Sequence, residues 1–430
     1  MEQTLTPAKK LSGETTVPGE FDLAAEALVL ASLAADESRI ANVPVSIEPV
    51  VDVVRNLGAQ VNQTDSCLLV KGTGVGQWSA PSTTVDLAAC GAAALPLVAV
   101  LSAQPFPASV KVDPDSVELT RRLIELLSPM GVKASEESEG VFRFEANDRP
   151  LRAAEYGNEE IPRMVKLSLL IAGMLAEGKT VLHEPVSTRD KADHLLRSRG
   201  VNIVGTRGVD RSQRRLGLEG GQTVGATELE VCGQLSLAMP ILTAALSLKG
   251  SKVTIKNVAM RSGTRLFLDL ARQIGAEVEV RETGAAVCDL YVTGGGTIKA
   301  TRIADKRAEN LLDHVALLAV LATQTEGAFV IRDVEVLRSA HEFDYLAHIV
   351  AALRSMGAKV GEYPEGLVVE GGHLLTGAGL RSNGNPELVQ AFSVAAMLAE
   401  GETVIHGTEC LDGVFPSFFD TLNSLKGGKR

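Results

Sequence analysis

Two helical patterns of apolar and polar positions recur along the whole chain. In one, small apolar residues make the helix hydrophobic on nearly all faces; in the other, charged and apolar residues alternate at helical spacing. A helix that is apolar all round must be surrounded by protein, whereas an amphipathic helix can cover a sheet. The inner helices are expected at residues 24–34, 88–103, 165–176, 235–248, 312–325 and 388–400.

After each inner helix the pattern predicts a short strand, an outer helix and further strands. The outer helix ends at a glycine, a residue that can take the left-handed conformation closing a helix. These glycines are Gly58, Gly131, Gly200, Gly275, Gly357 and Gly427. Their spacing of roughly 70 to 80 residues is too long for common solenoid repeats and indicates a compact unit with its own helices and strands.

The repeats therefore predict an α/β (α+β) protein of six units. Three units can pack their inner helices together behind three sheets, so we expect two similar lobes with a cleft between them as the site. Short connectors at residues 17–20 and 230–233 predict the chain crossings. The first lobe is expected to span residues 20–229, and the second to combine residues 1–19 with residues 230–430.

Composition narrows the possible partners. The chain has 430 residues and a formal net charge of -11, which argues against nucleic acid or an anionic membrane as the main partner. The N-terminus is polar and the apolar helices are shorter than a membrane span, so a cytoplasmic location is expected. The five cysteines are scattered without metal-ligand spacing, which predicts buried free thiols, no metal site and no cofactor.

Several segments resemble the EPSP synthase (3-phosphoshikimate 1-carboxyvinyltransferase) family in order and spacing. They include residues 11–19, 27–34, 38–40, 170–178, 253–258 and 401–410, followed by Phe415-Pro416. The resemblance implies a two-lobed enolpyruvyl transferase fold of six βαβαββ repeats, three in each lobe. It also implies a cleft that binds shikimate 3-phosphate and phosphoenolpyruvate through Lys and Arg, whose charges suit phosphate and carboxylate.

Most of those cations are replaced in this chain. Where the family has Lys, Ser and Arg at its opening motif, this chain has Phe21, Asp22 and Glu26. The other replaced positions are Leu95, Glu118, Tyr345, Glu387 and Gly413. The family's S-x-Q ahead of the third inner helix becomes Pro162-Arg163-Met164, while a hydroxyl survives at Thr188.

The resemblance places two carboxylates at catalytic positions. Asp313 falls on the family's general base and Glu342 on its glutamate beside phosphoenolpyruvate, although an Asp at the start of an apolar helix is often only a cap. The resemblance also gathers further acidic residues around one cleft, where they could bind a cationic or polyhydroxyl ligand or remain solvated charges. The candidate ligand-contacting residues are Asp22, Glu26, Glu118, Arg163, Thr188, Arg189, His341 and Glu387.

Three hypotheses follow from these replacements. A hydrogen bond to a charged group contributes about 1.5 to 3 kcal/mol, so losing at least six anchors removes on the order of 8 kcal/mol of substrate binding. The first hypothesis is therefore a protein that has lost the transferase activity and acts through a protein partner or by regulation. The second is new chemistry on an unidentified small ligand without phosphate, and the third is an active transferase rerouted through Arg163, Lys166, Arg189 and Lys191.

Overall fold

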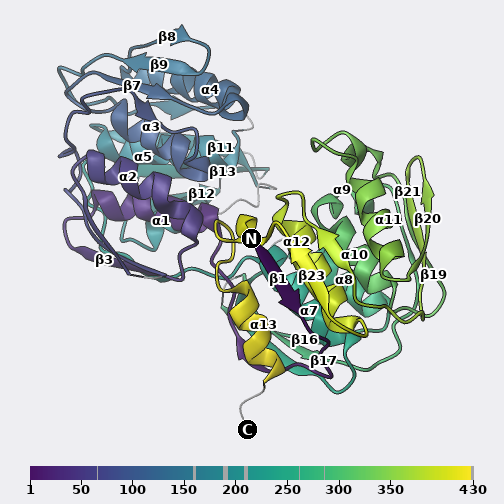
Figure 1. Cartoon of the computed structure of the whole chain (residues 1–430). Coiled ribbons are helices and arrows are strands. Elements are labelled where there is room, and N and C mark those ends of the chain that lie inside the picture. The colour runs from purple at the N-terminus through teal and green to yellow at the C-terminus, as the bar shows by residue number, and fades with distance from the viewer. Residues whose placement is uncertain are drawn as a thin grey trace. The chain divides into compact units, whose positions relative to one another are not determined.

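The computed structural model describes residues 1–64, 66–157, 161–186, 192–207, 212–260, 262–284 and 286–427. The chain divides into two compact units (Figure 1). Unit 1 combines Met1–Gly19 with Cys232–Arg430, and unit 2 is the continuous stretch Glu20–Val231. The sequence-based boundary at residues 229–230 thus lies just before the observed crossing, and Gly19 is the last residue of unit 1 before the other crossing.

In the described part of unit 2, the strands form three sheets of one design. In each sheet, a short strand pairs in parallel with a longer second strand. The second strand pairs antiparallel with a third, and the third pairs antiparallel with a fourth. The first sheet has the order β14 (Glu228–Glu230), β3 (Glu37–Ala41), β5 (Cys67–Lys71) and β4 (Gln60–Thr64). The second has the order β6 (Val85–Asp86), β7 (Ala108–Lys111), β9 (Val141–Phe144) and β8 (Ala134–Ser138). The third has the order β10 (Glu155–Tyr156), β11 (Lys179–Pro185), β13 (Gln213–Glu219) and β12 (Ile203–Arg207).

Two sheets in the described part of unit 1 repeat this design, and a third has three strands. One sheet has the order β16 (Glu277–Gly284), β17 (Val287–Thr293), β15 (Lys252–Ala259) and β2 (Ser12–Thr15). Another has the order β18 (Arg302–Ile303), β19 (Ala328–Ile331), β21 (Gly366–Glu370) and β20 (Lys359–Tyr363). The last has the order β1 (Glu2–Leu5), β23 (Thr403–His406) and β22 (Gly379–Arg381), and Figure 1 shows purple β1 beside yellow β23.

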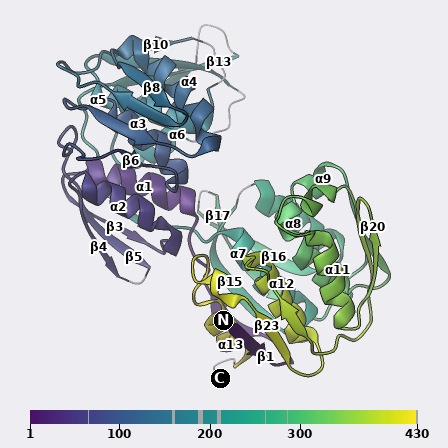
Figure 2. The same cartoon turned by 45° about the horizontal axis from the view of Figure 1, so that its top comes forward.

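Inner and outer helices occupy the places that the pattern predicts. The inner helices are α1 (Phe21–Leu33), α3 (Ala94–Leu101) and α5 (Arg163–Leu175) in unit 2, and α7 (Leu235–Ser247), α10 (Val315–Ala322) and α12 (Pro386–Leu398) in unit 1. The outer helices are α2 (Glu48–Asn56), α4 (Val117–Leu127), α6 (Ala192–Arg197), α8 (Ser262–Gln273), α11 (Tyr345–Ser355) and α13 (Phe418–Lys426). A short α9 (Lys306–Glu309) precedes α10. Figure 2 shows α1 and α2 lying along the sheet of β3, β4 and β5, which both helices contact.

Seven short 3₁₀ turns, all in the described ranges, precede or follow these helices. They are η1 (Val45–Ile47), η2 (Gly91–Ala93), η3 (Pro114–Ser116), η4 (Ser128–Met130), η5 (Leu312–His314), η6 (Glu335–Arg338) and η7 (Thr408–Leu411).

Each unit has its own core, built around its three inner helices. All residues of α3 and α10 are buried, as expected for helices that are apolar on every face. Within unit 2, α3 packs on α5, and within unit 1, α12 packs on both α7 and α10. The inner helices of each unit thus pack on one another inside its core.

Several sequence-based details are corrected by the structure. The helices expected at residues 88–103 and 312–325 are shorter, because 3₁₀ turns (η2 and η5) occupy their first residues. Five of the expected helix-closing glycines have positive φ, but Gly427 has a φ of -79°. All five cysteines are free thiols, yet Cys67 and Cys410 are only partly buried. Among the described residues, no helix combines the length and apolar character needed to cross a membrane.

Candidate functional site

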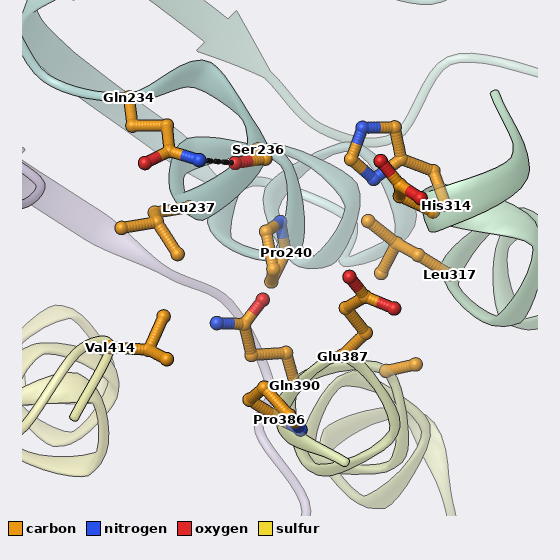
Figure 3. A pocket seen from close by; sticks show the side chains of 12 residues that line it. Gln234, Ser236, Leu237, Pro240, His314, Leu317, Pro386, Glu387, Gln390 and Val414 are labelled. Atoms are coloured by element: carbon orange, nitrogen blue, oxygen red, sulfur yellow. Dashed lines mark hydrogen bonds between the residues drawn. The ribbon is translucent and has the colours of Figure 1, made fainter. Parts of the chain in front are cut away.

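A pocket of about 230 Å³ lies in unit 1 where the N-terminal ends of α7, α10 and α12 meet. Figure 3 shows Glu387 and Gln390 entering it from α12, with Pro240 and Leu237 of α7 on another wall. Its lining consists of Gln234, Ser236, Leu237, Pro240, Asp313, His314, Leu317, Pro386, Glu387, Gln390, Ala391 and Val414. The described lining contains no lysine or arginine, so it offers no forked or ammonium cation to an anionic ligand.

Two carboxylates give the pocket its charge. Glu387 is the second residue of α12, and Asp313 lies in η5 directly before α10. Burial, together with the negative charge of Asp313, raises the pKa of Glu387 to about 7, and a hydrogen bond with Asn385 only partly opposes this shift. Glu387 therefore exchanges its proton near neutral pH, where it can act as donor or acceptor.

Uncharged polar groups complete the lining. The side-chain amide of Gln234 donates to Ser236 Oγ at 2.7 Å, as Figure 3 shows. Gln390 is only 5% exposed, and its amide makes no hydrogen bond to any other described residue although it borders the pocket. Burial lowers the pKa of His314 despite the nearby charge of Asp313, so its imidazole is neutral at pH 7. The pocket thus offers both donors and acceptors with little positive charge.

Tyr345 is the first residue of α11 and lies close enough to the two carboxylates to be affected by their charge. Its ring stacks on His341 with centroids 4.7 Å apart, and its hydroxyl is buried without a hydrogen-bond partner in the described structure. Burial, followed by the charges of Glu387 and Asp313, raises the pKa of Tyr345 well above its usual value. The phenol is therefore a neutral group held close to the acidic pair.

In unit 2, side chains of α1 contact residues at the start of α5 and in the turn η2 before α3. Glu26 of α1 is 1% exposed and accepts two hydrogen bonds from the guanidinium of Arg163, the first residue of α5, one of them at 2.7 Å. The ring of Phe21 covers Gly91 of η2 so closely that a Cβ on Gly91 would lie 2.6 Å from it. Arg163 at the start of α5 and Phe21 at the start of α1 thus both contact groups within unit 2.

A buried charge network lies next to this pair of helices. Lys166 of α5 is ion-paired with Glu184 of β11, and both side chains are almost fully buried. Arg214 approaches Glu184 at 3.6 Å and donates to Asp193 at 2.8 Å. Asp193 is also paired with Arg197. Lys166 and Arg163 therefore both have carboxylate partners within unit 2.

Known proteins resemble this chain along almost its entire length. The family profile of EPSP synthase (3-phosphoshikimate 1-carboxyvinyltransferase) matches residues 5–422. The chain belongs to the EPSP synthase family. A 3-phosphoshikimate 1-carboxyvinyltransferase of Gloeobacter violaceus is 32% identical, with 98% of each chain covered. One of a Synechococcus strain is 30% identical, with 98% of this chain and 96% of the relative covered.

Solved structures support the same fold. An EPSP synthase structure from Acinetobacter baumannii superposes with a TM-score of 0.78 at 22% sequence identity, covering 99% of this chain and 98% of that chain. The two-lobed enolpyruvyl transferase fold expected from the resemblance is confirmed. Membership of the EPSP synthase family thus agrees with the observed fold.

The acidic residues that the resemblance groups around one cleft have different surroundings within their own units. Asp313 and Glu387 line the same pocket in unit 1. Glu26 is not an open negative charge as expected, because Arg163 neutralises it. Glu118 is an exposed residue of α4 that pairs with Arg121 at 3.4 Å, and Asp22 is exposed in the first turn of α1.

The remaining candidates lie away from the pocket lining or outside the described residues. Glu342 is exposed and His341 stacks on Tyr345, but neither borders the pocket. Thr188 and Arg189 lie outside the described residues, as does Lys191. No group of three His, Cys, Asp or Glu side chains in the described ranges is arranged to hold a metal ion.

Sequence reasoning missed the uncharged residues of the pocket and the buried charge network. Gln234 and Ser236 directly flank the start of the apolar helix α7, and Gln390 interrupts the apolar face of α12. A polar residue inside an otherwise apolar helix is the signal that could have revealed Gln390. The pairing of Lys166 with Glu184 has no comparable local signal.

Proposed function

We propose that this member of the EPSP synthase family does not catalyse the carboxyvinyl transfer named for its relatives and that its unit 1 pocket takes a ligand without phosphate. The observation that carries this proposal is the pocket lining, which includes Asp313 and Glu387 but, among its described residues, no lysine or arginine. A protein partner remains a prediction that follows from the same loss of activity.

The charges of the described side chains support the proposal in both units. The resemblance implies substrates that carry phosphate and carboxylate groups, and each charge-assisted hydrogen bond to them contributes about 1.5 to 3 kcal/mol. In unit 1, a phosphate or carboxylate would meet two resident carboxyl groups. In unit 2, Arg163 already donates to Glu26, and the ring of Phe21 covers Gly91. Transfer requires the reacting groups to be held in place before a proton can move, and the described groups provide little that would hold an anion.

A titration and a phosphate-release assay test this proposal directly. The full chain is mixed with shikimate 3-phosphate and phosphoenolpyruvate at millimolar concentration, and heat of binding and release of inorganic phosphate are measured. We expect neither saturable binding nor turnover. Asp313→Asn is the control, because saturable turnover that disappears in this variant would overturn the proposal.

A second candidate is the 3-phosphoshikimate 1-carboxyvinyltransferase activity itself. It is favoured by the 32% identity over 98% of the chain to a protein of that name, which supports this activity more directly than it supports its loss. Asp313 also borders the pocket, where a base could act. Turnover in the assay above would establish this candidate, with any missing cation supplied by residues such as Arg189 or Lys191.

A further inference from the structure

The carboxyl groups of the unit 1 pocket lie at the helix ends where a bound anion would otherwise be favoured. The N-terminus of a helix carries about half a positive charge, and three helix N-termini meet at this pocket. Glu387 is in the first turn of α12, and Asp313 lies directly before α10. The side chain of Asn385 additionally caps α12 by accepting from the Leu388 amide at 2.9 Å. The chain therefore supplies its own negative groups at these helix ends.

Counting these charges indicates a pocket close to neutral. Three helix ends contribute roughly +1.5, while Asp313 and Glu387 contribute between about -1 and -2 as Glu387 gains or loses its proton near pH 7. His314 adds no charge at that pH, because burial lowers its pKa. Neither a strongly anionic nor a strongly cationic ligand is favoured by this balance.

Polar side chains in the lining nevertheless equip the pocket for hydrogen bonding. Gln390 is more than nine-tenths buried, points into the pocket and lacks a hydrogen-bond partner among the described residues (Figure 3). Pro240 has no N–H, so it cannot donate to the carbonyl of Ser236 four residues earlier, where an α-helix would normally form a bond. The amide of Gln390 can both donate and accept, so it suits a ligand whose groups do the same.

The apolar part of the lining suits a ring. Leu237, Pro240 and Leu317 form walls beside the polar groups. At about 230 Å³ the pocket is smaller than the roughly 300–1,000 Å³ of typical sites for drug-sized ligands. A small ring with C–H faces and hydroxyl edges matches both the size and the mixed lining.

We propose that the unit 1 pocket binds a small uncharged polyhydroxyl ring, of the size of a monosaccharide or cyclitol, through Glu387, Gln390 and the Gln234–Ser236 pair. This inference rests on the proposed function, because it names the phosphate-free ligand class. The amide of Gln390 can donate to one hydroxyl and accept from another. Glu387 in its protonated form can do the same, and Asp313 at the rim can accept from a hydroxyl.

The protonation of Glu387 makes the binding depend on pH. The groups that face it are Asp313 from η5, His314 from the same turn, Tyr345 from α11 and Asn385 from its own helix end. Loss of its proton removes a donor from the pocket. Affinity for a polyol should therefore fall between pH 6 and pH 8. The variant Glu387→Gln should remove most of this pH dependence, because its side-chain amide is a hydrogen-bond donor at both pH values.

The experiment compares ligands that differ in charge on one ring. The full chain is titrated by calorimetry and ligand-observed NMR with myo-inositol, glucose, glucosamine and glucose 6-phosphate. We expect at least one of the two uncharged ligands to bind saturably in the millimolar range and at least tenfold more tightly than glucosamine or glucose 6-phosphate. Tightest binding of glucosamine would overturn the proposal in favour of a cation site. Tightest binding of glucose 6-phosphate would overturn it in favour of an anion site.

Variants locate the binding and separate this inference from the proposed function. Gln390→Leu keeps the side-chain size and should weaken polyol binding at least tenfold, whereas Glu402→Gln, an exposed control in the same unit, should not change it. Thermal unfolding of each variant distinguishes loss of the amide from loss of the fold. If no uncharged ligand binds up to tens of millimolar, the inference fails, while the phosphate-release assay decides the proposed function separately.

Discussion

Arg163 Nη2 lies 2.7 Å from Glu26 Oε2, and the second guanidinium nitrogen contacts the other carboxylate oxygen. This pair joins the first residue of α5 to the buried face of α1 across 137 residues of sequence. It converts an expected acidic ligand group into a structural contact of unit 2.

Removing the guanidinium should destabilise unit 2. In Arg163→Ala, Glu26 keeps its charge in a site that is 1% exposed, so we expect a loss of about 2–4 kcal/mol. This is below the value for a fully buried pair because Arg163 is 42% exposed. Urea unfolding measures the change, and Arg122→Ala, which breaks an exposed contact to Glu125, should cost less than about 1 kcal/mol. Equal costs for the two variants would contradict this account of Glu26.

The buried pair of Lys166 and Glu184 should be more sensitive. Both side chains are less than one-tenth exposed, so Lys166→Met leaves a buried carboxylate whose remaining ion-pair partner among the described residues is Arg214, and it should cost about 3–5 kcal/mol. Lys179→Met, which removes an exposed contact to Glu219 on the same sheet, is the matched control. Urea unfolding that shows no difference between the two variants would be inconsistent with a buried ion pair.

Gly91 should not tolerate a side chain beneath Phe21. Gly91→Ala combines a positive φ of 46° with a contact of 2.6 Å to the ring, so we expect a loss of about 1–3 kcal/mol or more. Gly74→Ala is the control, because Gly74 also has positive φ but nothing within 4 Å of its added Cβ. Adding Phe21→Leu to Gly91→Ala should recover the steric part of the loss, as measured by thermal unfolding. Failure of this second change to recover stability would show that the ring is not the obstacle.

Glu387 should make unit 1 less stable as pH rises. Its pKa is about 7 in the folded protein against 4.5 for a free side chain, so the folded state holds the proton more strongly. The resulting stability is fully present below about pH 4.5 and is lost as pH rises through 7. The loss is at most about 3.4 kcal/mol, for a shift of about 2.5 pKa units at 1.36 kcal/mol per unit, and less for a group that water partly reaches.

Glu387→Gln isolates this contribution. The variant should be more stable than the wild-type chain at pH 8.5 by about 1–3 kcal/mol and nearly equal to it at about pH 4, as followed by urea unfolding at both pH values. Glu402→Gln should show no such difference between the two pH values. A variant that is less stable than wild type at pH 8.5 would indicate that the ionised form of Glu387 is the favoured one.

Local sequence patterns predict the repeats better than they predict the helix starts. The closing glycines Gly58, Gly131, Gly200, Gly275 and Gly357 take the expected positive φ, because this conformation is a property of the residue itself. The start of α3 depends instead on the turn at Gly91, which lies under Phe21 from another helix. Apolar composition alone extends the predicted helix through this turn.

The sequence predicts which residue types stand at the candidate site, but not which side chains contact one another there. The resemblance placed Asp313 and Glu387 around one cleft because they fall on the family's base and on a replaced cation, and both line the unit 1 pocket. It could not show that Arg163 reaches Glu26 or that Gln390 points into the pocket, since these depend on side-chain directions between helices. Charge at a position was visible in the sequence, but its neutralisation by a distant residue was not.

The path of the chain through the two units determines the order in which they can fold during translation. Unit 2 is a continuous stretch, whereas β1 and β2 of unit 1 pair with β23 and β15, which are made much later. Unit 2 can fold as soon as Val231 emerges, but the sheet containing β1 can close only after His406 has been translated. The first nineteen residues must therefore wait unpaired through most of translation, and a ribosome stalled before β23 would release a folded unit 2 with an unfinished unit 1 at its two ends.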